Sequence, residues 1–185
     1  MKHIEYEERV LISESDYKKV IEDVKKEGKP LTYLHIENIY LDDSNSYIRK
    51  TKKMLRIRRT NNTCEELTLK MKDADGSTIE INETLERHPI IDKELDNKFE
   101  EFHEVIRLTT ERIEVQYPNY LFVIDKNMYC GITDYDLEVE ADNQANAKKI
   151  IEFYCEKYKL QYDPKYKTKS HRAFNAMKEK RENSN

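Results

Sequence analysis

The feature that most constrains the fold of this chain is a repeated alternation of apolar and charged residues. Side chains on a β-strand point to opposite faces in turn, so this alternation predicts strands with one apolar and one polar face. In residues 3–12, the polar face carries Glu5, Glu7 and Arg9. Taken alone, this segment favours a half-buried strand with a solvated face, as is common in antiparallel sheets. The charged face indicates a binding site only if other segments of the chain provide complementary charges.

The same alternation recurs along the chain and predicts a sheet of seven or eight strands. The further strands are predicted at 34–41, 54–60, 65–72, 78–85, 108–117, 120–126 and 135–141. A helix opens at the capping pattern of Ser13 and Asp16 and ends before Gly28. Helical spacing predicts further helices at 91–105, 144–158 and 172–180. Residues 44–53 are a loop or short helical turn, 73–76 a hairpin turn, and 127–131 a connection.

These elements predict an α+β fold in which an antiparallel sheet closes into a β-barrel with the helices packed outside. The apolar stripe of each helix needs a sheet face to cover. If the apolar faces of the strands lie under the helices, the charged faces look at one another, and closure removes the exposed edges. We expect a single domain over residues 1–181 and a frayed tail at 182–185.

Cations gather on two neighbouring predicted strands. Arg56 and Arg58 lie on one of them, and Lys70 and Lys72 lie on the next. Like charges on neighbouring strands destabilise a sheet, and a polyanion among them relieves the repulsion. This arrangement therefore indicates a polyphosphate ligand.

Carboxylates occur in two pairs with one residue between the members. The pairs are Glu5 with Glu7, and Glu138 with Glu140. Such pairs suit a hard divalent cation such as Mg²⁺ or Mn²⁺. Cations for phosphate oxygens and carboxylates for a metal form the combination that a nucleotide or polyphosphate enzyme needs. The alternative is a twisted sheet with one wet face and no ligand.

The composition argues against several classes of protein. A net charge of −4 argues against a general nucleic-acid binder, and the three glycines are scattered and form no phosphate loop. Cys64, Cys130 and Cys155 are isolated, which fits a reducing compartment and provides no zinc ligand set. No apolar run is long enough for a signal peptide or a membrane span. We therefore expect a cytoplasmic protein without a membrane partner.

The ordered series of motifs resembles the CYTH domain, or triphosphate tunnel metalloenzyme, superfamily. The family signature near the N-terminus is E-x-E-x-K, and the corresponding run here is Glu5-Tyr6-Glu7-Glu8-Arg9. The resemblance continues in order through Asn38-Ile39-Tyr40-Leu41-Asp42, Leu55-Arg56-Ile57-Arg58, Leu67-Thr68-Leu69-Lys70, Glu80-Ile81-Asn82, Glu111-Arg112, Ile124-Asp125, Leu137-Glu138-Val139-Glu140 and Tyr166-Lys167-Thr168-Lys169-Ser170. It covers almost the whole chain and looks most similar to the short, single-domain YjbK-like bacterial branch.

The resemblance implies a role for each matched residue. It implies metal ligands at Glu5, Glu7, Glu80, Asp125, Glu138 and Glu140. It implies triphosphate contacts at Arg56, Arg58, Lys70, Lys72, Arg112, and Lys167 or Lys169, with Glu5, Glu7 and Arg9 as catalytic residues. Two positions depart from the family pattern. Arg9 stands where Lys is usual, and Asn82 stands where many members have a second Glu, which weakens a second metal site.

The resemblance also implies a barrel tunnel that binds a triphosphate lengthwise together with Mg²⁺ or Mn²⁺. The expected activity is hydrolysis of inorganic tripolyphosphate or of a nucleoside or other organic triphosphate. Class IV adenylate cyclases share the family, so conversion of ATP to cyclic AMP and pyrophosphate remains open, as does a non-catalytic polyphosphate- or nucleotide-binding protein. The expected partner is a small-molecule triphosphate rather than nucleic acid, and a homodimer is possible by analogy.

Overall fold

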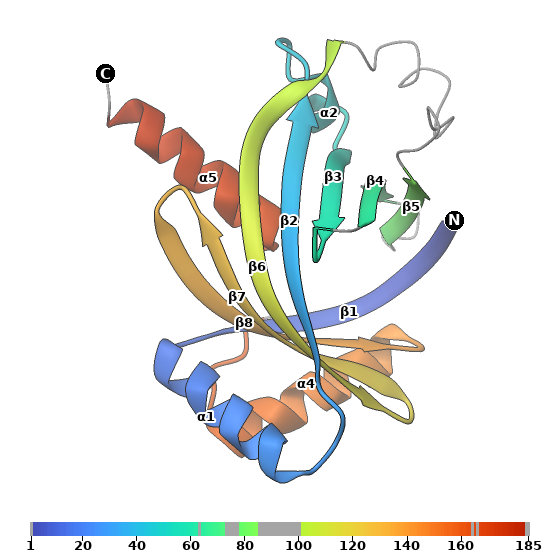
Figure 1. Cartoon of the computed structure of the whole chain (residues 1–185), viewed down its shortest axis with the longest axis vertical. Coiled ribbons are helices and arrows are strands. Elements are labelled where there is room, and N and C mark those ends of the chain that lie inside the picture. Colours follow the sequence, from blue (N-terminus) through green and yellow to red (C-terminus); the bar gives the residue numbers. More distant parts are fainter. Residues whose placement is uncertain are drawn as a thin grey trace. The chain divides into compact units, whose positions relative to one another are not determined.

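The computed structural model describes residues 2–62, 64–72, 78–84, 101–163, 165 and 167–183. For residues 2–5, 64, 72, 78, 83 and 84 it describes the backbone alone. The described strands are β1 Lys2–Ile12, β2 Thr32–Asp42, β3 Met54–Thr60, β4 Cys64–Lys72, β5 Thr78–Thr84, β6 His103–Tyr117, β7 Tyr120–Tyr129 and β8 Ile132–Ala141. The described helices are α1 Glu14–Lys26, α2 Tyr47–Lys50, α4 Gln144–Tyr158 and α5 Lys169–Glu182 (Figure 1).

The strands form one antiparallel sheet whose hydrogen-bonded order closes on itself. The order is β1-β5-β4-β3-β2-β6-β7-β8, and β8 pairs again with β1, so the sheet is a closed barrel. The start of β1 pairs with β5, where His3 lies opposite Glu80, and the rest of β1 pairs with β8, where Arg9 lies opposite Glu138. This confirms the predicted α+β fold with an antiparallel closed sheet.

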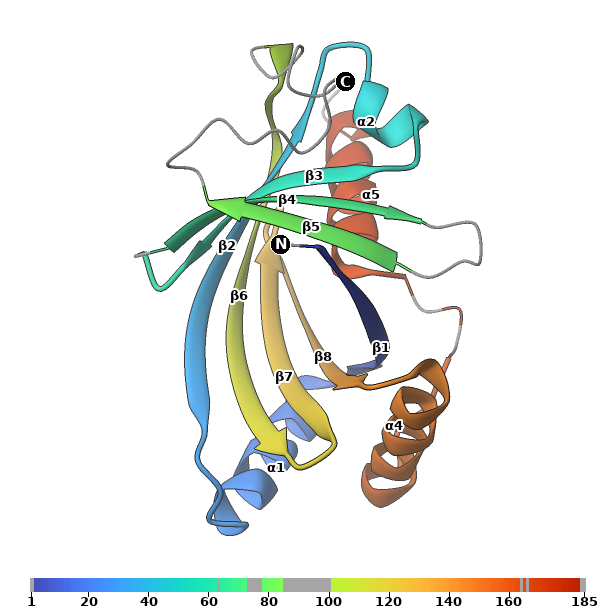
Figure 2. The same cartoon turned by 90° about the vertical axis from the view of Figure 1, so that its right-hand side faces the viewer.

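The chain divides into two compact units. The first comprises Met1–Glu5 and Ile36–Thr109, and the second comprises Tyr6–His35 and Thr110–Asn185. In the first unit, β3, β4 and β5 lie side by side (Figure 2), and the apolar face of the sheet packs against Ile48 of α2. The Asp42 carboxylate holds α2 in place, because its Oδ1 accepts the backbone N–H of Ile48 at 2.8 Å.

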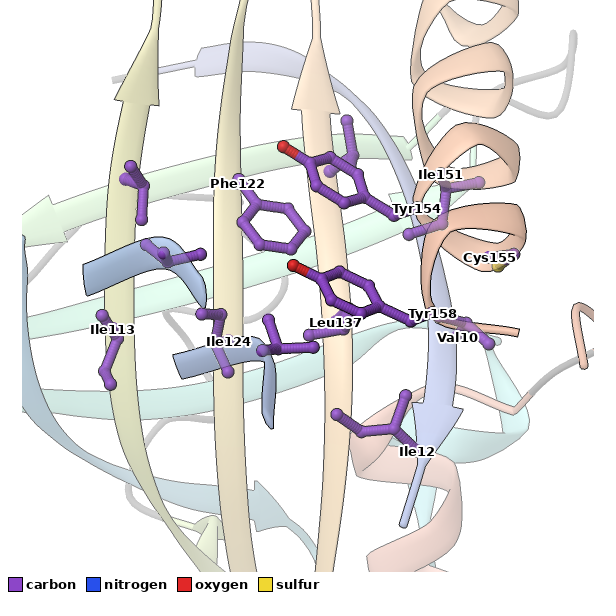
Figure 3. Close-up of a cluster of buried hydrophobic side chains, with 14 residues drawn as sticks. Val10, Ile12, Ile113, Phe122, Ile124, Leu137, Ile151, Tyr154, Cys155 and Tyr158 are labelled. Atoms are coloured by element: carbon purple, nitrogen blue, oxygen red, sulfur yellow. The ribbon is translucent and has the colours of Figure 1, made fainter. Parts of the chain in front are cut away.

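The main apolar core of the second unit lies between the sheet and two helices. Both α1 and α4 contact β8. Figure 3 shows Tyr154 and Tyr158 of α4 pointing toward the strands, and the Tyr154 ring stacks on Phe122 of β7 at 4.0 Å between centroids. Side-chain caps fix where the helices begin: Ser13 accepts the backbone N–H of Asp16, and Asn143 accepts that of Asn146. The helices therefore cover the apolar face, as the amphipathic pattern predicts.

Most predicted elements are confirmed to within a few residues, and residues 44–53 contain the short helix α2. Two predictions are wrong in part. The helix predicted at 91–105 fails at its end, because β6 begins at His103; residues 91–100 lie outside the described residues. Phe102 and Ile106 are four residues apart, a spacing that fits a strand as well as a helix. The turn predicted at 73–76 also lies outside the described residues.

The second partial error concerns the connection predicted at 127–131. The strand β7 continues to Tyr129, and the turn consists of Cys130 and Gly131, both with positive φ. Asn127 is unusual inside a strand, but it is buried here and donates to the carboxylates of Asp134 and Asp136 at 3.0 Å. Tertiary hydrogen bonds thus outweigh its weak strand propensity.

No helix in the described part of the chain has the length and apolar character needed to cross a membrane.

Candidate functional site

A row of four carboxylates runs along β8. These are Asp134, Asp136, Glu138 and Glu140, at alternate positions and hence on one face of the strand. The register with neighbouring strands adds further charges. Glu7 lies opposite Glu140, Arg9 lies opposite Glu138, and Asp125 lies opposite Asp136. The sheet pairing therefore assembles an acidic group with cations beside it, entirely within the second unit.

Glu138 is the centre of this group. Its carboxylate contacts three cations: Arg9 Nη1 at 3.0 Å, Arg112 Nη2 at 2.9 Å and Lys169 Nζ at 3.1 Å. Burial by itself would raise the pKa of Glu138, but the charges of Arg9, Lys169 and Arg112 outweigh it and hold that pKa well below its usual range. Glu138 is therefore a carboxylate at neutral pH.

Arg112 and Lys169 also compensate Asp125, which is fully buried. The Arg112 guanidinium donates twice to the Asp125 carboxylate, from Nε at 3.0 Å and from Nη2 at 2.9 Å. Lys169, the first residue of α5, contacts Asp125 and lies 3.5 Å from Asp136 Oδ1. Lys167 is exposed, so Lys169 is the lysine of this segment that joins the acidic group. Bidentate and charge-assisted bonds of this kind are strong and directional.

A second layer of bonds holds Asp136 in place. Arg172 of α5 donates to Asp134 at 2.7 Å from Nε and to Asp136 at 2.7 Å from Nη2. Asn127 bridges the same two carboxylates, and Thr110 Oγ1 donates to Asn127 Oδ1 at 2.8 Å. Burial, opposed by Lys169 and assisted by the charge of Glu138, raises the pKa of Asp136 to about 6.

The acidic group suits a divalent metal on its ligand chemistry. Two sets of carboxylates have ligand oxygens within 4.8 Å of one another: Glu7 with Glu138 and Glu140, and Asp125 with Asp136 and Glu138. Hard cations such as Mg²⁺ and Mn²⁺ prefer carboxylate oxygens. Glu138 belongs to both sets, and cations contact both: Arg9 contacts Glu7 and Glu138, and Arg112 and Lys169 contact Asp125 and Glu138. Within the described residues, Asp136 Oδ1 is buried and lacks a hydrogen-bond partner.

The first unit carries a separate polar group on β3, β4 and β5. Glu80 is buried; Lys70 Nζ contacts its carboxylate, and Arg56 Nη2 lies 3.7 Å from it. Burial would raise the pKa of Glu80, but the charges of Lys70 and Arg56 lower it to about 2. Asn82 Nδ2 donates to Glu80 Oε1 at 2.9 Å, and Arg58 Nε donates to Asn38 Oδ1 at 3.2 Å.

The predicted site residues thus fall into two groups. Those brought together in the second unit are Glu7, Arg9, Arg112, Asp125, Glu138, Glu140 and Lys169, and those on the polar face of the first unit are Arg56, Arg58, Lys70 and Glu80. The side chains of Glu5 and Lys72 lie outside the described residues, and Lys167 joins neither group through a described side-chain contact.

Sequence reasoning missed several residues that shape the site, among them Asp136, Asn127 and Arg172. Asp136 occupies the same face of β8 as Glu138, so the alternation that found Glu138 and Glu140 could have found it. Asn127 and Arg172 left no such signal, because a strand Asn and a helical Arg acquire their roles only through partners distant in the sequence.

The low pKa of Glu80 predicts how the stability of the fold depends on pH. The pKa of Glu80 is about 2 in the folded chain and near 4.5 in the unfolded chain. Glu80 therefore stabilises the fold above pH 4.5, and this contribution is lost as the pH falls toward 2. Its full contribution is about 3 kcal/mol. Glu80→Gln should therefore lower the free energy of unfolding at pH 7 by about that amount, and by progressively less between pH 4.5 and 2. Urea unfolding of both proteins across this range measures the difference, and a constant difference would contradict the assignment.

Comparison with solved structures shows the same fold in proteins of low sequence identity. A Bacillus halodurans protein provisionally named an adenylate cyclase matches with a TM-score of 0.78 and 24% identity, over 94% of this chain and 98% of that chain. A Hippeastrum protein, provisionally named an adenylyl cyclase and with a dominant triphosphatase activity, matches with a TM-score of 0.72 and 18% identity, over 97% of this chain and 96% of that chain. A Pyrococcus horikoshii protein matches with a TM-score of 0.60 and 22% identity, over 88% of this chain and 96% of that chain.

No curated protein matches the sequence. The sequence model of one domain family, however, matches residues 3–171, a span that contains both groups of predicted site residues and, apart from Lys2, every described strand. The closed sheet, the acidic row on β8 and this match agree, and the chain belongs to the CYTH domain family.

Proposed function

We propose that this chain is a divalent-metal-dependent triphosphate hydrolase that acts on inorganic tripolyphosphate or on nucleoside and other organic triphosphates. The observation that carries the proposal is the group around Glu138, where carboxylates with metal-ligand spacing lie in direct contact with Arg9, Arg112 and Lys169. Phosphoryl transfer depends mainly on positioning and on charge neutralisation. A site with both metal-binding carboxylates and fixed cations provides both.

In this proposal, Glu7, Glu138 and Glu140 hold Mg²⁺ or Mn²⁺. Glu5, whose side chain lies outside the described residues, is a further ligand on the family pattern alone. When bound, the metal would supply positive charge to offset the charge of the phosphate and would make a water molecule more acidic. Arg9 keeps Glu7 and Glu138 oriented, since it contacts both carboxylates. Asp125 serves mainly to orient Arg112 and Lys169, because its own charge is already compensated by them.

The cations of the first unit are proposed as phosphate contacts. Arg56 is the strongest candidate, because within the described residues its Nε and Nη2 atoms are buried and have no hydrogen-bond partner. The family pattern adds Arg58, Lys70 and Lys72 as further phosphate contacts. Lys70 and Arg56 would also keep Glu80 ionised and paired with them, rather than leave it as a metal ligand. Charge-assisted hydrogen bonds from such groups neutralise the phosphate oxygens.

Hydrolysis and cyclisation need the same metal and the same cations, so the product decides between them. A cyclase must hold the ribose 3′-OH in line with the α-phosphorus, whereas a triphosphatase needs only a positioned water at a terminal phosphorus. We favour the hydrolase, since the motifs of this chain specify charged contacts and no adenine pocket. The triphosphatase activity of the Hippeastrum protein is compatible with this choice.

We expect purified protein with Mg²⁺ or Mn²⁺ to release orthophosphate from tripolyphosphate, and to convert ATP more slowly to ADP and orthophosphate. Tripolyphosphate should be faster because the site recognises phosphate oxygens and metal rather than the base. A phosphate-release assay with tripolyphosphate, ATP, GTP and thiamine triphosphate, followed by chromatography of the ATP products, measures this. Cyclic AMP with stoichiometric pyrophosphate would instead establish a cyclase, and binding without turnover of any triphosphate would establish a binding protein.

A further inference from the structure

Thr68 lies in the middle of the polar face of the first unit. In the register of the sheet it lies opposite Arg56 on β3 and opposite Asn82 on β5. Directly opposite residues on paired strands share a face, so these three side chains form one row across the sheet. Thr68 is fully buried, at 0% exposure, and Arg56 is almost as deeply buried, at 6%.

This row contains polar atoms whose hydrogen-bonding capacity is unused. Within the part of the chain that the structure describes, Thr68 Oγ1 and the Nε and Nη2 atoms of Arg56 have no hydrogen-bond partner. Buried polar atoms are nearly always hydrogen-bonded, so an unused group in a native fold needs a reason. Among the described side chains, Arg56 forms an ion pair with Glu80, in which Nη2 lies 3.7 Å from the carboxylate, beyond a hydrogen bond.

The chemistry of these atoms indicates the kind of ligand that would use them. The two guanidinium N–H groups can only donate, and the Thr68 hydroxyl can donate as well. Arg56 lies in this row, and Lys70 and Glu80 lie beside it; these three side chains together carry one net positive charge. Buried donors with a net positive charge suit an anionic group that offers several acceptor oxygens.

We propose that Thr68 is a binding residue for a phosphoryl group, with its hydroxyl donating to a phosphoryl oxygen beside Arg56. The identity of the anion rests on the function proposed above. Thr68 differs from the charged residues because a neutral hydroxyl adds almost nothing to a diffuse positive field. Its contribution depends on the oxygen lying at one position, so Thr68 favours a correctly seated triphosphate over an anion held loosely by charge.

The variant Thr68→Val tests the proposal, because it removes the hydroxyl while it keeps the volume and the β-branched shape. We expect tripolyphosphate to bind about tenfold more weakly, since a hydrogen bond to a charged group is lost. The melting temperature without ligand should be unchanged or higher, because an unused buried hydroxyl is replaced by a methyl group. Titration calorimetry of the full chain with tripolyphosphate in EDTA, where metal-dependent turnover cannot consume the ligand, measures the affinity.

Two further variants make the result decisive. Thr68→Ser keeps the hydroxyl and should retain most of the affinity. Thr110→Val is the matched control for stability: Thr110 is also a buried strand threonine, but its hydroxyl already donates to Asn127, so its melting temperature should fall. If Thr68→Val melts lower, as Thr110→Val should, and binds tripolyphosphate like the wild type, the Thr68 hydroxyl is structural and the inference is overturned. If the wild type itself fails to bind tripolyphosphate, the proposed function fails with it.

Discussion

Glu138→Gln is expected to slow metal-dependent phosphate release strongly and to destabilise the fold by about 3–5 kcal/mol. The side chain is only 3% exposed and contacts Arg9, Arg112 and Lys169. Glutamine keeps the shape but removes the charge, so buried cations lose a shared counter-charge. Removing one partner of a buried ion pair is costly for that reason. The rate should fall by at least about a hundredfold, since an electrostatic group at the reacting centre is lost.

The direction of the stability change is the informative part. Two carboxylates close together on a strand repel each other, and neutralising one of them would then stabilise the fold. The three cations around Glu138 reverse that expectation. Thermal unfolding of the variant measures the change in stability, and titration with Mn²⁺ measures the change in metal binding. Glu140→Gln is the matched control, because Glu140 is only partly buried; it should weaken Mn²⁺ binding at little cost in stability. A Glu138→Gln protein as stable as the wild type would show that Glu138 does not compensate the cations.

Arg56→Gln is expected to weaken tripolyphosphate binding by about a hundredfold, because two charge-assisted hydrogen bonds and a charge are lost. Binding of orthophosphate should weaken much less, since the longer anion uses more of the polar face. Arg59→Gln is the matched control: Arg59 is the same residue type on the same strand, but it points to the other face, is 39% exposed and pairs with Glu37 and Glu65. Calorimetric titration of each variant with both anions measures the losses.

Equal losses for tripolyphosphate and orthophosphate would mean that Arg56 supplies only a diffuse positive field. Equal losses for Arg56→Gln and Arg59→Gln would lead to the same conclusion, because the loss of one positive charge is all that the two variants share. The prediction therefore depends on the face of β3 to which each guanidinium points, and that face follows from the alternation of side chains along the strand.

The sequence by itself determined the strands and the composition of their faces. Alternation is a local property, so the strand at 54–60 and the shared face of Glu138 and Glu140 can be predicted without a structure. The helix at 144–158 can equally be predicted from the sequence, since its apolar residues repeat with a helical period. Where the local signal was ambiguous, prediction failed: the spacing of Phe102 and Ile106 fits both periods, and the chain there forms β6.

Only the tertiary structure decided which charges meet. Lys169 contacts Asp125 across 44 positions of sequence, and Arg172 contacts Asp136 across 36. Nothing in the local pattern distinguishes Lys169 from the exposed Lys167, because the choice depends on where α5 begins and on which strand it packs against. The same holds for the unused hydroxyl of Thr68, since it became apparent only once sheet register and burial were known. Periodicity specifies the face on which a side chain lies, whereas its partners depend on the register and packing of segments that are far apart in the chain.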